Sequence, residues 1–152
     1  MRRNFTILIL SLGLFSCSNP SNDLQDTQWL IGTWEYAFNQ SIEMETWNKK
    51  EHELRGTGLF ISLGDSVPMR KMGIISENGK LVLVIQEESF EYISKYHIEY
   101  LGKDSLVAVS HSNVWPQRII YTKPDANHLH KHMSGKQQQM NNSVTSYYTL
   151  KK

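Results

Sequence analysis

The chain is poor in cysteine, glycine and proline. Its 152 residues include one Cys, 9 Gly and 4 Pro. A single cysteine excludes a disulfide scaffold and a CxxC metal or redox site. With 39% hydrophobic and 20% charged residues, the composition also excludes a disordered or collagen-like chain. We therefore expect one globular domain with a single hydrophobic core.

The chain also lacks an excess of either charge and lacks the common catalytic motifs. Its formal net charge is +1, so it has no basic field for nucleic acid, and we expect no nucleic-acid partner. It contains no Gly-x-Ser-x-Gly sequence and no phosphate-binding glycine loop. In Ser110-His111-Ser112 no acid is placed to orient the histidine. We expect no catalytic residue and no cofactor, and an enzyme is the less favoured class.

The N-terminus has the pattern of a secretory signal peptide. Arg2 and Arg3 precede an apolar run over residues 5–15, which is interrupted by few polar residues. A membrane-spanning helix needs about 20 apolar residues, so this run is too short to be a retained transmembrane anchor. A charged start followed by a short apolar run predicts a signal peptide over residues 1–16.

The single cysteine stands at the end of this apolar run. The sequence Leu14-Phe15-Ser16-Cys17 resembles the bacterial lipobox, in which a small residue precedes a cysteine that is acylated and becomes the mature N-terminus. The resemblance implies that Cys17 carries lipid and that residues 17–27 form a tether to a membrane of the bacterial cell envelope. Each buried CH₂ of an acyl chain contributes about 0.8 kcal/mol to such attachment. The alternative is an ordinary secreted protein with an unpaired cysteine.

The remainder of the chain, residues 28–152, consists of short runs rich in β-branched and aromatic residues, separated by turn residues. Asn78-Gly79 is the sharpest turn signal, because both residues adopt the positive φ angles of a type I′ hairpin. We predict an all-β fold with about ten antiparallel strands. Closure into an up-and-down barrel removes the two free edges of such a sheet. A two-sheet β-sandwich is the alternative.

Two motifs resemble those of a known class of barrel. Gly32-x-Trp34 resembles the Gly-x-Trp signature with which lipocalin-like (calycin) barrels begin. The strand Glu43-x-Glu45-x-Trp47 and the run Asn113-x-Trp115-Pro116-Gln117-Arg118-Ile119-Ile120-Tyr121 are similar to those of an uncharacterised bacterial lipoprotein family with this fold. The resemblance covers residues 28–150. It implies a barrel and no particular activity.

A barrel of this size can enclose a cavity, and the sequence offers residues to line it. We predict an aromatic lining with two polar anchors and list these residues as candidates for ligand binding: Trp34, Trp47, Tyr96, Tyr100, Glu45 and Arg118. The first hypothesis is a membrane-tethered barrel that binds a small, partly apolar or anionic ligand. Two alternatives remain: an isomerase or hydrolase with Glu45 as its base, and a structural or partner-binding lipoprotein with a filled barrel.

Two roles are open for Arg118. Its guanidinium can face the interior and hold a carboxylate or phosphate of a ligand. Alternatively, the resemblance to lipocalin-like barrels implies that it stacks on Trp34 and closes the base. If Trp47 points inward, Glu45 does so too, and it then needs a partner such as Arg118 or a tyrosine hydroxyl. We expect a structural ion pair at Glu45 rather than a catalytic base.

His128, His130 and His132 alternate along the chain and therefore share one face of a strand. Residues i and i+2 lie about 6.6 Å apart on a strand, so at most two of these imidazoles could share a zinc ion. The expected neighbouring strands, residues 117–121 and 137–150, contain no His, Asp, Glu or Cys that could complete a site. We predict an outward polar face and no metal.

Overall fold

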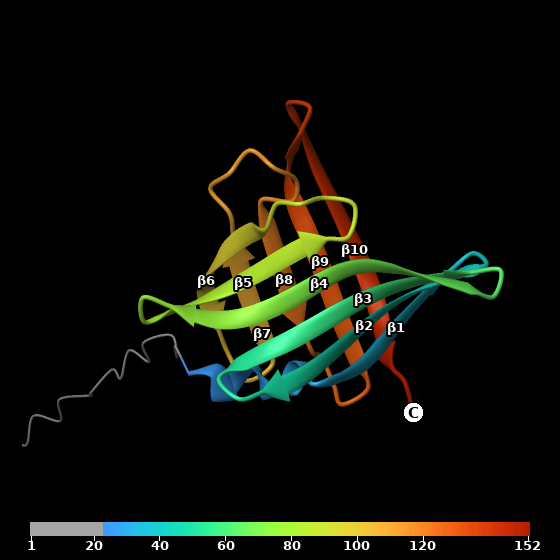
Figure 1. Cartoon of the computed structure of the whole chain (residues 1–152), viewed down its shortest axis with the longest axis horizontal. Helices are drawn as coiled ribbons and strands as arrows, with labels where there is room; N and C mark the ends of the chain where they lie inside the picture. Colours follow the sequence, from blue (N-terminus) through green and yellow to red (C-terminus); the bar gives the residue numbers. More distant parts are fainter. Residues whose placement is uncertain (1–22) are drawn as a thin grey trace, which may run out of the picture.

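The computed structural model describes residues 23–152, and ten antiparallel strands close into a barrel (Figure 1). The predicted signal peptide, Cys17 and most of the predicted tether lie outside the described residues. A 3₁₀ helix, η1 (Leu24–Leu30), precedes the strands. The strands are β1 (Gly32–Phe38), β2 (Ser41–Lys50), β3 (Glu53–Ser62), β4 (Asp65–Glu77), β5 (Lys80–Glu87), β6 (Ser94–Leu101), β7 (Ser105–Val109), β8 (Arg118–Thr122), β9 (His128–Gln137) and β10 (Met140–Leu150).

Each strand pairs with its neighbours in sequence, and β1 also pairs with β10. The predicted up-and-down barrel is therefore confirmed, and the two-sheet sandwich is excluded. Asn78 and Gly79 have φ angles of 53° and 74° and join β4 to β5, as the hairpin signal predicts. Among the described residues, no helix is long and apolar enough to span a membrane.

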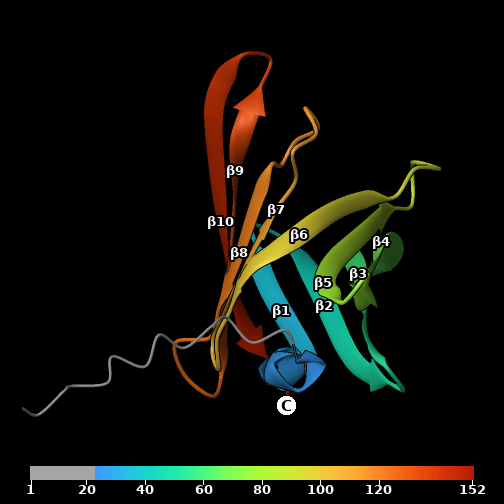
Figure 2. The same ribbon diagram turned by 90° about the vertical axis from the view of Figure 1, so that its left-hand side faces the viewer.

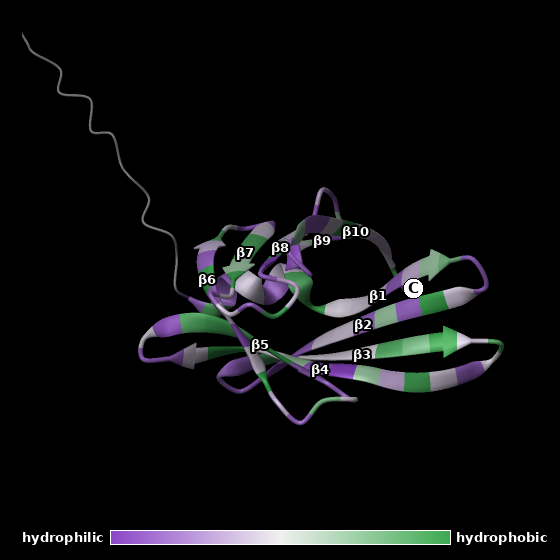
Figure 3. Cartoon of the chain, turned by 90° about the horizontal axis from the view of Figure 1, so that it is seen from above, coloured by the Kyte–Doolittle hydropathy of each residue, from purple (hydrophilic) through white to green (hydrophobic). Residues whose placement is uncertain are grey.

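Alternation along the strands decides which side chains enter the interior. Hydrophobic and hydrophilic residues alternate along β2 (Figure 3). On β2, Glu45 and Trp47 are completely buried, while Met44 and Thr46 on either side of Glu45 are only partly buried. The prediction that Glu45 and Trp47 share the inward face is confirmed, and a carboxylate therefore stands inside the barrel.

A β-bulge overturns the expectation for Tyr100. Tyr96 is 3% exposed and faces inward, whereas Tyr100 is 49% exposed. The pairing of β6 with β7 shifts in register between Ile98 and Tyr100, which leaves Glu99 as an extra residue. Because a one-residue shift reverses every later side chain, Tyr100 turns outward and Leu101 takes the inward position. Tyr100 therefore does not line the interior.

The helix η1 closes one end of the barrel, below the strands in Figure 2. Leu30 is completely buried, and its carbonyl oxygen accepts a hydrogen bond from Trp34 Nε1 at 2.8 Å. Lys123 Nζ lies 5.2 Å from the centre of the Trp34 ring and donates to the carbonyl oxygen of Trp29 at 3.2 Å. A cation thus covers Trp34 at the base of the barrel, but it comes from Lys123.

The opposite end of the interior is accessible to solvent. Along the inward face of β2, Trp47 and Glu45 are fully buried, whereas the side chain of Glu43 is 13% exposed. On β1, exposure rises in the same direction from Trp34 at 0% to Phe38 at 36%. Strands β9 and β10 diverge from β6 toward this end (Figure 2). We call it the open end.

Gly56 on β3 makes room for the Trp47 ring. A Cβ atom at this glycine would lie 2.8 Å from Cε3 of Trp47. We expect Gly56→Ala to lower the free energy of unfolding by about 1–3 kcal/mol, because the added methyl group overpacks the interior. Urea denaturation measures this change. Thr57→Val, at an exposed outward position on the same strand, should stay within about 0.5 kcal/mol of wild type. Equal stability of both variants would contradict this packing.

Candidate functional site

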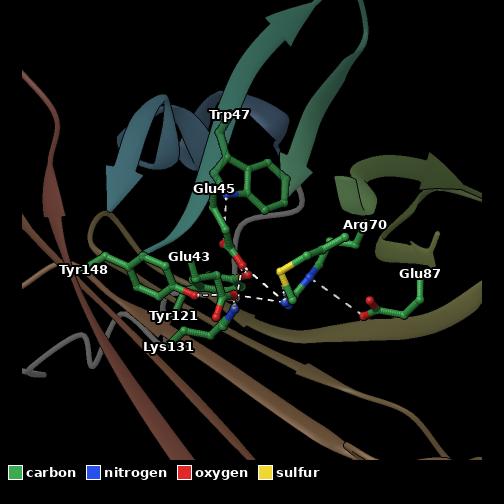
Figure 4. A network of polar contacts seen from close by, with 9 residues as sticks. Glu43, Glu45, Trp47, Arg70, Glu87, Tyr121, Lys131 and Tyr148 are labelled. Atoms are coloured by element: carbon green, nitrogen blue, oxygen red, sulfur yellow. Dashed lines mark hydrogen bonds and ion pairs between the residues drawn. The ribbon is translucent and has the colours of Figure 1, made fainter. Parts of the chain in front are cut away.

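A buried ion pair crosses the interior of the barrel. Lys131 on β9 has a side chain that is 2% exposed, and its Nζ donates to Glu45 Oε1 at 2.5 Å and to Glu43 Oε1 at 3.0 Å (Figure 4). Glu43 and Glu45 belong to β2, which is not adjacent to β9 in the barrel. The contact therefore joins two walls that have no backbone hydrogen bonds to each other.

Arg70 on β4 adds a second cation from a third wall. Its Nη2 donates to Glu43 Oε1 at 3.0 Å, and its Nη1 lies 3.8 Å from Glu45 Oε1. The side chain lies against Gly58 on β3, where a Cβ atom would be 2.8 Å from Arg70 Cγ. Because Gly58 has no side chain, the guanidinium reaches into the barrel interior, and the side chain of Arg70 is only 10% exposed.

Two tyrosines complete the hydrogen bonding of the carboxylates. Tyr121 donates to Glu45 Oε2 at 3.0 Å, and Tyr148 donates to Glu43 Oε1 at 2.8 Å. Trp47 Nε1 also donates to Glu45 Oε2, at 3.4 Å. Burial, together with the negative charge of Glu45, raises the pKa of both phenols well above the ordinary tyrosine value. At neutral pH both tyrosines are therefore protonated donors. We call these side chains the ionic network: Glu43, Glu45, Arg70, Tyr121, Lys131 and Tyr148.

Burial and charge oppose each other at the ionised members of this network. Burial raises the pKa of Glu43, but the positive charges of Lys131 and Arg70 outweigh it and the pKa is lowered overall. Burial lowers the pKa of the Arg70 guanidinium, while Glu45 and Glu43 raise it above the ordinary arginine value. Glu43 and Arg70 are therefore fixed charges at neutral pH.

Aromatic rings flank the ionic network on the side of the open end. Tyr36 and Phe60 are the cross-strand neighbours of Glu43 on β1 and β3, so they share its inward face. The ring centre of Tyr36 lies 5.7 Å from that of Tyr148 and 5.2 Å from that of Phe38. The ring centres of Phe38 and Phe60 are 6.0 Å apart. We call Tyr36, Phe38 and Phe60 the aromatic strip. It places apolar surface beside fixed charges.

The predicted candidates are only partly brought together. Trp34, Glu45, Trp47 and Tyr96 are all buried in the interior, and Glu45 and Trp47 belong to the same set of contacts. The expectation that a tyrosine hydroxyl serves as partner of Glu45 is confirmed by Tyr121. Trp34 lies at the closed base, and Tyr96 sits on β6 opposite Leu83 of β5.

Both roles expected for Arg118 are wrong. Its side chain is 47% exposed on the outer face, 3.9 Å from Glu99. On β8, Ile119 and Tyr121 are buried, so alternation turns Arg118 outward. Its expected role at Trp34 belongs to Lys123.

Arg70, Lys131 and Tyr148 were not anticipated from the sequence. Lys131 carried a signal, since it stands between Leu129 and Met133 on the face opposite the histidines. A lone lysine on an otherwise apolar strand face needs a buried acid. Arg70 carried no such signal because the next residue, the exposed Lys71, makes the pair look like a solvated surface.

The histidine row lies outside the barrel. His128 Nδ1 contacts Asp125 at 2.8 Å, and His132 Nδ1 contacts Thr145 Oγ1 at 2.8 Å. His130 packs edge-on against the Tyr147 ring. Within residues 23–152, no group of three or more His, Cys, Asp and Glu side chains is placed to hold a metal ion. Each of the three histidines therefore contacts a different residue.

The geometry does not favour Glu45 as a catalytic base. Its Oε1 faces Lys131 and Arg70, and its Oε2 accepts hydrogen bonds from Tyr121 and Trp47. A general base needs a lone pair aimed at a substrate proton. Three hydrogen-bond donors and the nearby guanidinium of Arg70 occupy both oxygens, so the arrangement suits the fixation of charge better than proton abstraction.

Comparison with known proteins adds no assignment. No family model, curated protein or solved structure matches the chain. The closed barrel is consistent with a lipocalin-like fold, and the resemblance to the lipoprotein family stays a prediction. Function must therefore be inferred from the geometry of the site.

We expect Lys131→Met to lower the free energy of unfolding by about 3–5 kcal/mol, because it leaves the buried Glu45 without its closest cation. Chemical denaturation measures the loss. Lys151→Met is the matched control, since Lys151 pairs with Glu35 at the surface and should cost less than about 1 kcal/mol. Addition of Glu45→Gln to Lys131→Met should recover part of the loss. Strict additivity would contradict the coupling.

Proposed function

We propose that the protein is a membrane-tethered bacterial lipoprotein whose barrel binds a small, partly apolar ligand at the open end of its interior. The observation that carries the proposal is the aromatic strip beside the ionic network. Small-molecule sites combine apolar walls with a few fixed polar groups. Phe38 offers exposed ring surface, while Glu43 and Arg70 supply charges that are held in place before any ligand arrives.

Preorganisation strengthens such a site. Because three walls of the barrel fix the guanidinium of Arg70 and the ammonium of Lys131, little side-chain entropy remains to be lost when a ligand binds. Most members of the aromatic strip are partly buried against each other, so their rings are also restrained. The open end is thus a rigid surface with one apolar and one charged part.

The tether supports an orientation for this site. Cys17 precedes Asp23 by six residues, which reach at most about 20 Å when fully extended. Asp23 leads into η1, which closes the base of the barrel. An acyl group on Cys17 would hold that base near the membrane. The open end would then face away from the membrane, toward solutes of the periplasm or the exterior.

The binding role predicts a saturable site for an apolar probe. We expect N-phenyl-1-naphthylamine to bind the purified barrel with increased fluorescence. Phe38→Ser should raise the Kd of the probe about 5- to 30-fold, because the substitution removes an aromatic contact that contributes about 1–2 kcal/mol. Tyr147→Ser, which removes a ring from the outer face of β10, is the control and should leave the Kd unchanged. A folded barrel without saturable binding would support the filled-barrel lipoprotein instead.

The proposed lipid tether predicts that one substitution releases the protein from the membrane. We expect Cys17→Ser to abolish sedimentation with membranes while the barrel stays folded, because residue 17 precedes η1 and the first strand. Cell fractionation with immunodetection measures the distribution. Ser18→Ala is the control and should stay with the membrane fraction. A Cys17→Ser protein that loses residues 1–16 and still sediments with membranes would disprove lipid attachment at this residue.

A further inference from the structure

One donor of the ionic network has no acceptor. In the described part of the chain, Arg70 Nε is buried and makes no hydrogen bond. The other two nitrogens of the guanidinium face Glu43 and Glu45. Buried polar groups are rarely left unpaired, because the lost hydrogen bonds to water cost free energy. An unpaired donor beside the aromatic strip therefore points to a group that is bound there in function.

Glu87 stands next to this donor without satisfying it. It lies directly opposite Arg70 in the pairing of β4 with β5. Its Oε1 is 3.8 Å from Arg70 Nε, which is too far for a hydrogen bond (Figure 4). The side chain of Glu87 is 41% exposed, in contrast to the buried carboxylates of Glu43 and Glu45. Glu87 is therefore a loosely held counter-ion that can turn into solvent.

We propose that Glu87 occupies the place of a ligand carboxylate, and that the protein binds small carboxylates with an apolar tail. This inference rests on the proposed binding function. The ligand carboxylate accepts hydrogen bonds from Arg70 Nε and from a neighbouring nitrogen of the same guanidinium, the usual bidentate arrangement. Glu87 then turns into solvent. The tail lies along the aromatic strip, which begins at Phe60 and Tyr36 beside Glu43.

Exchange of Glu87 for another carboxylate leaves the charge of the site unchanged. Three carboxylates, Glu43, Glu45 and Glu87, face two cations, Arg70 and Lys131. Departure of Glu87 leaves two charges of each sign, and a ligand carboxylate brings back the one negative charge that has left. An amine would meet two cations, and Glu43 Oε1 and both oxygens of Glu45 already accept hydrogen bonds from other donors. An alcohol could accept one hydrogen bond but would bring no charge to replace that of Glu87.

The test compares three head groups on one tail. Octanoate, octanol and octylamine are titrated against N-phenyl-1-naphthylamine bound to the full-length barrel, and octanoate should displace it at the lowest concentration. Glu87→Gln should strengthen octanoate binding about 3- to 10-fold, because it removes the competing charge. Glu88→Gln is the matched control: its side chain is 52% exposed and pairs with Lys71 at 3.9 Å, so octanoate affinity should not change.

A direct readout accompanies the titration. Octanoate should shift the NMR signal of the Arg70 Nε–H group, since that hydrogen gains an acceptor. Displacement by octanol or octylamine at equal or lower concentration would overturn the inference, and so would an unchanged or weaker octanoate affinity in Glu87→Gln. Those results leave the proposed binding function intact if the probe itself binds. Absence of saturable binding of the probe and of all three compounds would overturn both.

Discussion

The salt bridge between Lys131 and Glu45 is the contact on which the interior depends. Desolvation of two charges is costly, and the attraction between them offsets that cost only when further hydrogen bonds are made. Tyr121 and Trp47 provide such hydrogen bonds to Glu45, and the guanidinium of Arg70 lies 3.8 Å from it. The salt bridge also specifies the fold, because a one-residue slip of β9 would move Lys131 to the outer face and leave the carboxylate unpaired.

The interior is divided into two ends with different chemistry. At the base, η1 and Lys123 cover Trp34, and large apolar side chains fill the space. At the open end, the ionic network and the aromatic strip meet at partly exposed positions. The filled base stabilises the barrel, and the binding site that we propose lies at the opposite, accessible end.

Local patterns predicted the strands better than they predicted the site. Asn78-Gly79 identified its hairpin because the turn depends on two adjacent residues. Tyr100 was misplaced because a bulge in β6 depends on the pairing with β7 and leaves no mark in the alternation itself. Arg118 was misplaced because the sequence of its strand allows either set of alternating residues to face inward. In the structure Ile119 and Tyr121 face inward, so Arg118 faces outward. The partners Arg70 and Lys131 come from distant strands, which no local pattern relates.

Closure of the barrel has a consequence for folding. Neighbouring strands join through short connections, whereas β1 and β10 meet through pairs such as Trp34 with Leu150, at opposite ends of the chain. Closing so long a loop costs more entropy than forming a hairpin, so this pairing is expected late in folding. Until β10 is available, β1 has a free edge that can pair with another chain. The last strand of the barrel therefore also protects the first from aggregation.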